Sequence, residues 1–225
     1  MTVRTTSEKL PIVVLISGEG TNLQAILDAC ANGAVPASVK AVISSRAEAP
    51  GLRRAAAASI PMHVILAAEN TSREDYDSAL NIILERYEPK LVLLAGFMRI
   101  LSDDFVRRYR GRLLNIHPSL LPKYRGLYTH RQVLAAGERE HGCSVHFVTE
   151  ELDGGPVIAQ AKVSVRPDDT EKALAARVLQ REHALYPLII RWFAKDRVKL
   201  AANQVVFDGK PLTGPKVFAS NEVLK

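Results

Sequence analysis

Two polar residues in an apolar segment combine an amide with an imidazole. Residues 113–118 read Leu-Leu-Asn-Ile-His-Pro, which places Asn115 and His117 two positions apart. On an extended chain such side chains point to the same face, and an amide donor beside an imidazole can stabilise an oxyanion and move a proton. Each residue alone has an ordinary explanation as well, because an asparagine at a strand end often forms a turn and a single histidine is usually a surface residue.

The carboxylate that would complete this group is Asp153. It would pair with His117, favour its cationic form and fix its orientation. The competing role is a purely structural one, capping the turn before the glycine pair that follows. Cys143 begins an apolar strand pattern and is expected in the core, and Ser119 follows the His-Pro bond without a nucleophile-elbow motif. A reaction without a covalent enzyme intermediate is the simpler hypothesis.

A glycine-rich turn follows the first apolar strand. Residues 17–22 read Ser-Gly-Glu-Gly-Thr-Asn, and the amides at the start of the next helix can receive a phosphate. No Gly-Lys-Ser/Thr follows, so the turn is not a P-loop. Leu23 replaces the third glycine of the dinucleotide fingerprint, and Arg46 stands near the place of its acidic residue, which disfavours a nicotinamide cofactor. What remains is a phosphate monoester site at Gly20, Thr21 and Asn22, or a tight turn that binds no ligand.

These residues need elements that bring them to one edge of a sheet. Short apolar runs at 12–16, 39–43, 62–66, 91–95 and 113–116 are typical of strands covered on both faces. Helical patterns separate them, including an alanine-rich helix at 50–58 and a helix that a capping box at Ser72 and Asp75 begins. This alternation predicts an α/β fold with a doubly wound, mostly parallel, Rossmann-like sheet.

The second half of the chain has a different pattern. Residues 144–149 and 157–165 are rich in strand-forming residues and are joined by a Glu-Glu-Leu-Asp-Gly-Gly-Pro loop. A long helix is expected at 170–193, with Pro187 as a point where it would kink. Residues 198–207 with a turn at Asp208-Gly209 predict a peripheral antiparallel hairpin. We therefore expect a short extension at 1–10, one domain at 11–193, and a peripheral hairpin and tail at 194–225.

The composition limits the classes of partner that we expect this chain to bind. No apolar run approaches the roughly 18–20 residues of a membrane helix, and residues 1–9 lack a signal core. Cys30 and Cys143 have no metal-like spacing, so we expect no metal and a cytoplasmic protein with reduced thiols. The net charge of +6 suggests nucleic acid, but no long basic run with interleaved aromatics supports it. We expect neither a nucleic-acid nor a membrane partner, and a basic surface that attracts small anions.

Taken together, the segments resemble the phosphoribosylglycinamide formyltransferase family, the folate-dependent transformylases of purine synthesis. The matching pieces, in family order, are VVLISGEGTNLQAILDAC, LVLLAGFMRILS, GRLLNIHPSLLPKYRGLYTHRQVL, HGCSVHFVTEELDGGPVIAQAKV and REHALYPLII. The NIHPSLLP block is shared with other formyltetrahydrofolate enzymes. The SGxGTN turn and the DGGPVIAQ segment narrow the resemblance from formyltetrahydrofolate enzymes in general to the phosphoribosylglycinamide formyltransferase family.

The resemblance implies the formyltransferase fold and formyl transfer from 10-formyltetrahydrofolate to the amine of glycinamide ribonucleotide, with no metal and with a homodimer left open. It implies that the catalytic residues are Asn115, His117 and Asp153. The substrate residues it implies are Gly20, Thr21, Asn22, Leu23, Gln24 and Glu182. The implied folate residues are Arg73, Met98, Arg99, Ile100, Leu101, Asn115, Thr149, Glu150, Glu151, Leu152 and Asp153. Glu19, Tyr128 and Leu179 depart from the family pattern, which bears on secondary substrate contacts.

Three rival functions are weighed against this one. A formyltetrahydrofolate hydrolase usually carries an N-terminal regulatory domain. In this sequence, only the short extension at 1–10 precedes the predicted domain at 11–193. A methionyl-tRNA formyltransferase usually carries a C-terminal RNA-binding domain, whereas only residues 194–225 follow the long helix. A non-catalytic nucleotide- or folate-binding module would not need the Asn115, His117 and Asp153 group.

Overall fold

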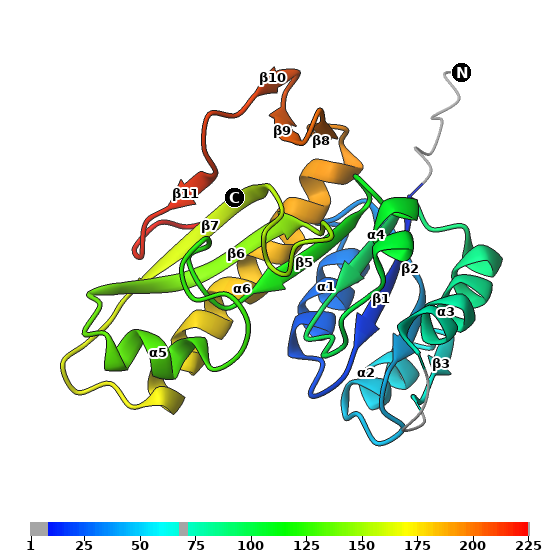
Figure 1. The fold of residues 1–225 in the computed structure, drawn as a ribbon, viewed down its shortest axis with the longest axis horizontal. Helices are drawn as coiled ribbons and strands as arrows, with labels where there is room; N and C mark the ends of the chain where they lie inside the picture. Colours follow the sequence, from blue (N-terminus) through cyan, green and yellow to red (C-terminus); the bar gives the residue numbers. More distant parts are fainter. Residues whose placement is uncertain (1–8, 68–71, 225) are drawn as a thin grey trace.

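An eight-stranded sheet forms the centre of the molecule (Figure 1). The computed structural model describes residues 9–67 and 72–224. The strand order is β11-β7-β6-β5-β4-β1-β2-β3, with parallel pairing except for β5–β6 and β6–β7, which are antiparallel. The strands are β1 (Leu10–Ile16), β2 (Ala37–Ser44), β3 (Met62–Val64), β4 (Leu91–Leu94), β5 (Leu113–His117), β6 (Glu140–Phe147), β7 (Val157–Ser164) and β11 (Lys216–Phe218). The mostly parallel α/β sheet predicted from the sequence is confirmed.

Alternation along β1 explains why both faces of the sheet are covered. Ile12, Val14 and Ile16 belong to a core with helices α1 and α6, whereas Val13 and Leu15 belong to a second core with α3 and α4. Because neighbouring side chains of a strand point to opposite faces, an unbroken apolar run requires a helical layer on each side. The helices are α1 (Thr21–Ala31), α2 (Gly51–Ala57), α3 (Arg73–Tyr87), α4 (Asp103–Arg108), α5 (Thr129–Ala135) and α6 (Glu171–Ala194).

Helix starts follow the expected capping chemistry. Ser72 Oγ accepts a hydrogen bond from the Asp75 amide at 3.0 Å, which confirms Ser72 as the N-cap of α3, and donates to Asp75 Oδ2 at 2.7 Å. Thr170 Oγ1 accepts from the Ala173 amide at 3.1 Å and begins α6, which continues through Pro187 to Ala194. The buried Tyr186 hydroxyl of α6 contacts the Leu94 and Leu114 carbonyls at 3.1 and 3.0 Å, so this helix is attached to β4 and β5.

The C-terminal segment divides between two sheets. Strands β8 (Val198–Ala201), β9 (Gln204–Phe207) and β10 (Lys210–Pro211) form a separate antiparallel sheet, and β11 pairs in parallel with β7 at the edge of the main sheet. The expected hairpin at 198–207 therefore turns at Ala202-Asn203, where both residues have positive φ, and Asp208-Gly209 makes the following turn. Trp192 of α6 holds this C-terminal segment against the helix. The centroid of its ring lies 4.8 Å from that of Phe207 and 6.3 Å from that of Phe218.

The strand order reverses between β1 and β4. From β1 the chain moves outward to β2 and β3, and then returns to place β4 on the other side of β1. In open α/β sheets, ligands bind beyond the carboxyl ends of the strands at such a switch point. The glycine turn follows β1, and Asn115 and His117 lie at the carboxyl end of β5, beside β4. The topology thus brings the predicted polar groups to one edge.

Candidate active site

A buried serine joins three strand ends at the switch point. Ser17, directly after β1, has a side-chain Oγ that accepts from the Met98 amide at 2.8 Å and lies 2.6 Å from Ser45 Oγ. The Ser17 amide donates to the Gly96 carbonyl at 3.1 Å. Met98 and Gly96 follow β4, and Ser45 follows β2, so one side chain holds the connections around the site in fixed relative positions. In sequence, Ser17 is marked only by its place at the start of the glycine turn.

The structure brings Asn115, His117 and Asp153 together. Asp153 lies in the loop between β6 and β7, where one carboxylate oxygen is 3.5 Å from His117 Nδ1 and the other is 3.5 Å from Asn115 Nδ2. The backbone amide of Gly126 donates to the same carboxylate at 2.9 Å. The His117 and Asp153 side chains are 6% and 8% exposed, so bulk water screens this group only weakly.

His117 has an acceptor at each ring nitrogen. Nε2 lies 2.9 Å from the Tyr124 carbonyl oxygen, and Nδ1 faces Asp153. Because a carbonyl oxygen only accepts, Nε2 carries a hydrogen, and a ring protonated on both nitrogens satisfies both partners. Tyr124 has a positive φ of 55°, which turns its backbone towards this histidine. The contribution of this loop is a backbone contact that residue type does not reveal.

A second histidine, His146, orients Asn115. The register of β5 and β6 sets the two residues opposite each other, and Asn115 Nδ2 lies 3.2 Å from His146 Nε2. His146 Nδ1 lies 2.9 Å from the Phe147 carbonyl, so Nδ1 carries the hydrogen and Nε2 accepts from Asn115. Burial lowers the pKa of His146 to about 4, which keeps the ring neutral near pH 7. The asparagine therefore presents its nitrogen here, with one N–H directed at His146 Nε2 and the other at the more distant Asp153 Oδ1, 3.5 Å away.

The glycine turn is closely packed against α2. Gly20 has φ 68°, and a Cβ there would come 2.6 Å from the Gly51 Cα. The Gly51 amide donates to the Gly18 carbonyl at 3.0 Å. Gly20 precedes α1 without a side-chain cap, and the first turn of α1 contains no acidic residue. The amides of this turn are therefore available to an anion.

The expected substrate residues differ in the burial and in the partners of their side chains. Asn22 Nδ2 donates to Glu182 Oε2 at 2.7 Å, which joins α1 to α6 across 160 positions. Burial raises the pKa of Glu182, and the Asn22 hydrogen bond opposes that shift. Leu23 is fully buried in the core, so only its backbone faces the turn. Gln24 is held by Asp28 at 2.8 Å and by Arg54 at 3.4 Å.

The expected folate segment after β4 exposes apolar side chains beside the site. Met98 is 69% and Ile100 is 53% exposed, whereas Leu101 is buried. The Arg99 guanidinium carbon lies 4.3 Å from the centroid of the Tyr76 ring of α3. Asp77, buried on α3, accepts from the Ser102 amide at 2.6 Å, and burial raises the pKa of its carboxyl group. Arg73, also expected to contact folate, is exposed at the first position of α3.

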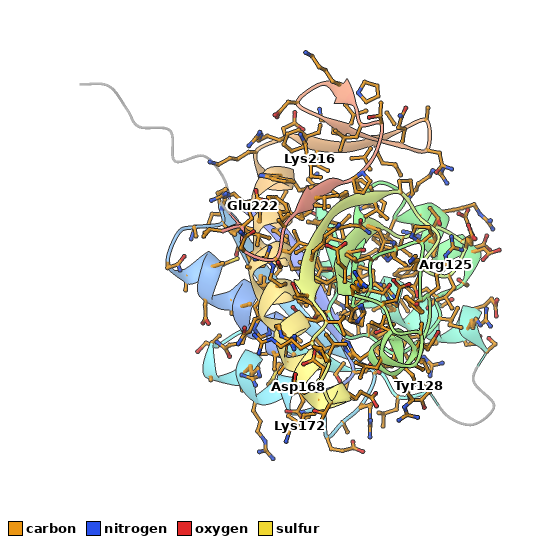
Figure 2. The ribbon with its side chains drawn as sticks, turned by 90° about the vertical axis from the view of Figure 1, so that its left-hand side faces the viewer. Arg125, Tyr128, Asp168, Lys172, Lys216 and Glu222 are labelled. Atoms are coloured by element: carbon orange, nitrogen blue, oxygen red, sulfur yellow. The ribbon has the colours of Figure 1, made fainter. Side chains whose placement is uncertain are left out.

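The loop that carries Asp153 is held by charges on its outer side. Glu150 lies 3.8 Å from both Arg107 and Arg110, and Glu151 pairs with Arg125, which is labelled in Figure 2. Thr149 Oγ1 contacts the Glu151 carbonyl at 3.5 Å. Inside the loop, a Cβ on Gly155 would come 1.8 Å from the Phe147 carbonyl oxygen, so this close approach requires glycine. Leu152 remains 56% exposed.

The groups considered as nucleophiles are engaged elsewhere. Cys143 is fully buried, which confirms its predicted place in the core. The Ser119 hydroxyl is also buried and donates to the Lys123 carbonyl at 2.7 Å. Within residues 9–67 and 72–224, no three or more His, Cys, Asp or Glu side chains are grouped to hold a metal ion. None of the helices described there combines the length and apolar character needed to cross a bilayer.

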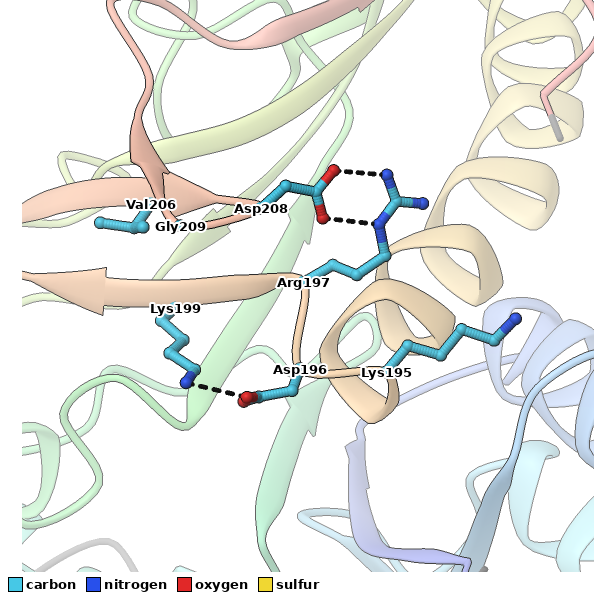
Figure 3. Close-up of a pocket in the computed structure, with 7 residues that line it drawn as sticks. All are labelled: Lys195, Asp196, Arg197, Lys199, Val206, Asp208 and Gly209. Atoms are coloured by element: carbon cyan, nitrogen blue, oxygen red, sulfur yellow. Dashed lines mark hydrogen bonds and ion pairs between the residues drawn. The ribbon is translucent and has the colours of Figure 1, made fainter.

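A hollow beside the C-terminal hairpin is lined by charged residues, four of which form two ion pairs with one another (Figure 3). Arg197 Nε and Nη2 donate to the two Asp208 carboxylate oxygens at 2.8 and 2.7 Å. Lys199 Nζ lies 2.9 Å from Asp196 Oδ2. This hollow contains neither the switch-point residues nor the Asn115 group.

Comparisons with known proteins agree with this geometry. The formyl transferase family model matches residues 10–190. The phosphoribosylglycinamide formyltransferase of Escherichia coli (strain K12) is 56% identical over 211 residues, which cover 94% of this chain and 99% of that relative. The chain belongs to the phosphoribosylglycinamide formyltransferase family.

Solved structures place the fold in the same group of enzymes. The phosphoribosylglycinamide formyltransferase from Coxiella burnetii has a TM-score of 0.90 at 54% identity, covering 94% of this chain and all of that one. A formyltetrahydrofolate deformylase from Pseudomonas putida KT2440 has a TM-score of 0.81 at 26% identity, covering 90% of this chain and 71% of that one. The core is thus shared between a transferase and a deformylase, and the chain itself is a formyl transferase.

The three departures from the phosphoribosylglycinamide formyltransferase pattern lie in different surroundings. Tyr128 is 65% exposed with φ 59°, and the Arg131 guanidinium lies 5.3 Å from its ring centroid; Figure 2 labels its position. Leu179 is half-buried on α6. Glu19 is exposed, and its carbonyl accepts from Arg54 at 2.8 Å. Arg54 is a contact of the glycine turn that the sequence does not reveal, because it lies 35 positions after Glu19.

Proposed function

We propose that this enzyme transfers the formyl group of 10-formyltetrahydrofolate to the amine of 5'-phosphoribosylglycinamide, in de novo purine biosynthesis. The names of its relatives supply the substrate and reaction class. The observation that carries the proposal for this chain is the approach of Asn115, His117 and Asp153 at the carboxyl end of β5, with 3.5 Å contacts to both carboxylate oxygens. An amide donor, an imidazole and a carboxylate suit an acyl transfer that passes through an oxyanion.

The reaction proceeds by direct attack. The substrate amine forms a bond to the formyl carbon, and the formyl oxygen takes the negative charge. The Asn115 N–H that makes the long 3.5 Å contact with Asp153 turns to donate to that oxygen, and the imidazolium of His117 stabilises its charge. Collapse breaks the bond from carbon to folate N10, and the proton lost by the amine passes to N10 through water. The products are the formylated ribonucleotide and tetrahydrofolate.

The two substrates approach from different strand ends. The phosphate of the ribonucleotide binds the turn at Gly20, Thr21 and Asn22, and its ribose lies beside Glu182. The folate lies along residues 98–101 and the loop 149–153, whose exposed apolar side chains suit a flat heterocycle. Asn115 and His117 lie at the end of β5, next to β4 and its loop, where the formyl group would be placed.

Formyl transfer with and without the ribonucleotide acceptor tests this function. We expect acceptor-dependent formation of tetrahydrofolate, with His117→Ala and Asn115→Ala each lowering kcat about 100- to 1,000-fold. Binding of either substrate should change little in these variants. Asp153→Asn should lose transfer and shift the pH profile. Acceptor-independent release of formate would instead support the deformylase reaction of the structural relative, and wild-type turnover in the His117 and Asn115 variants would exclude the assigned roles.

The association state is a separate expectation. A homodimer remains a prediction, and sedimentation of the full chain across a concentration series measures it. Salt-dependent binding of tRNA in the same buffers would contradict the proposal that the enzyme uses only small-molecule substrates.

A further inference from the structure

Arg54 of α2 connects the glycine turn to the first turn of α1. Its Nε donates to the Glu19 carbonyl at 2.8 Å, and its Nη1 donates to Gln24 Oε1 at 3.4 Å. Glu19 precedes Gly20, and Gln24 lies one helical turn after it, so one guanidinium spans the amides at the start of α1. The remaining nitrogen, Nη2, makes no hydrogen bond to another described residue.

The backbone of α2 places this side chain. Gly51 contacts Gly20 and donates to the Gly18 carbonyl at 3.0 Å, which fixes the first residue of α2 against the turn. Arg54 follows three positions later, and its Cδ would lie 3.5 Å from a Cβ on Gly20. Residues three apart on a helix share a face, so the same face of α2 that packs on the turn also presents the guanidinium.

The positive charge of Arg54 acts on a histidine of α6. Burial lowers the pKa of His183, and the Arg54 charge lowers it further, so the guanidinium lies within electrostatic range of this ring. His183 follows Glu182, which is bonded to Asn22 of α1. Arg54 therefore lies between α2 and the start of α1, and its charge acts on His183 of α6. Leu179, one turn earlier on α6, has no charge to contribute.

We propose that Arg54 is the phosphate-positioning residue of this enzyme, which fixes the glycine turn and supplies the cationic contact to the substrate's phosphate. The proposal rests on the function proposed above. A guanidinium suits this task because it is always charged and can donate to the backbone and to a phosphate oxygen at the same time. The backbone amides at the start of α1 orient the phosphate through directional hydrogen bonds, and Arg54 supplies a full positive charge.

A variant-by-substrate comparison tests the proposal. Steady-state kinetics are measured for wild type, Arg54→Ala, Arg54→Lys and Arg53→Ala, with glycinamide ribonucleotide and with its dephosphorylated riboside. Arg53 is the matched control, because it is the exposed neighbour on the same helix. For Arg54→Ala we expect KM for the ribonucleotide to rise about tenfold or more, with kcat and the KM for folate nearly unchanged. Arg54→Lys should recover part of the loss, and Arg53→Ala should match wild type.

The riboside separates a phosphate contact from a general structural effect. With this substrate, Arg54→Ala and wild type should have the same kcat/KM, because no phosphate is present to lose a contact. Equal losses with both substrates, or an unchanged KM for the ribonucleotide, would overturn the proposal. Inorganic phosphate provides a second readout, since it should inhibit wild type competitively and inhibit Arg54→Ala more weakly. If wild type itself transfers no formyl group to the ribonucleotide, the proposed function fails instead, and phosphate binding by calorimetry still tests Arg54.

Discussion

Replacing His146 tests whether a neighbouring ring sets the orientation of Asn115. Asn115 Nδ2 lies 3.2 Å from His146 Nε2, and the proton on His146 Nδ1 is held by the Phe147 carbonyl at 2.9 Å. Removing the ring leaves only the longer 3.5 Å contact with Asp153 to keep the nitrogen and oxygen of the Asn115 amide from exchanging positions. A rotated amide would direct an oxygen at the developing oxyanion, which is repulsive.

The expected magnitude follows from the contacts. Complete loss of an oxyanion donor costs about 2.7–4 kcal/mol, which bounds the effect from above. A single neutral hydrogen bond contributes about 1 kcal/mol net, and an unpaired buried donor costs about 1–3 kcal/mol. We therefore expect His146→Ala to lower kcat/KM about tenfold, less than Asn115→Ala does. His146→Gln should remain within about threefold of wild type, because a glutamine side chain can place an acceptor near the Nε2 position.

The assay is kcat/KM for formyl transfer in a double-mutant cycle. His146→Ala is compared in the wild-type and Asn115→Ala backgrounds, and thermal melting verifies that each variant is folded. If His146 acts through Asn115, the second substitution adds no further loss in the Asn115→Ala background. The same fractional loss in both backgrounds would refute this coupling and leave His146 as a packing residue only.

Three further predictions concern stability and folate binding. Burial lowers the pKa of His141 from 6.5 to about 4, so the unfolded chain takes up a proton before the folded one does. Stability should be complete above pH 6.5 and fall by about 3 kcal/mol as the pH drops to 4, and urea unfolding of wild type and His141→Gln measures that difference. Asp77→Ala removes the acceptor for the Ser102 amide, and should raise KM for folate several-fold with partial rescue by Asp77→Asn; unchanged folate KM would contradict it. Deleting residues 212–225 removes β11 and the two carbonyls that Arg181 contacts at 2.7 and 2.9 Å, so the melting temperature should fall, and an unchanged melting curve would show that the tail contributes nothing.

Elements with a strong local signal were predictable. The buried strands and the capped helix at Ser72 required only apolar runs and a short polar motif. Some boundaries differed, as for β6, which was expected at 144–149 but begins at Glu140, four residues earlier, and ends at Phe147. The place of β11 was not predictable, because Lys216–Phe218 is short and its partner β7 lies more than fifty positions earlier.

The sequence by itself determined which chemistry the chain carries. Strand alternation sets Asn115 and His117 on one face, and the glycine turn before α1 provides open amides, because both follow from the covalent geometry of a few consecutive residues. Only the tertiary structure decided their partners. Strand register set His146 opposite Asn115, the loop after β6 brought Asp153 to His117, and packing of α2 brought Arg54 to the turn. These contacts join segments about 30 or more positions apart, and local propensity does not encode such distances; strand order and register do.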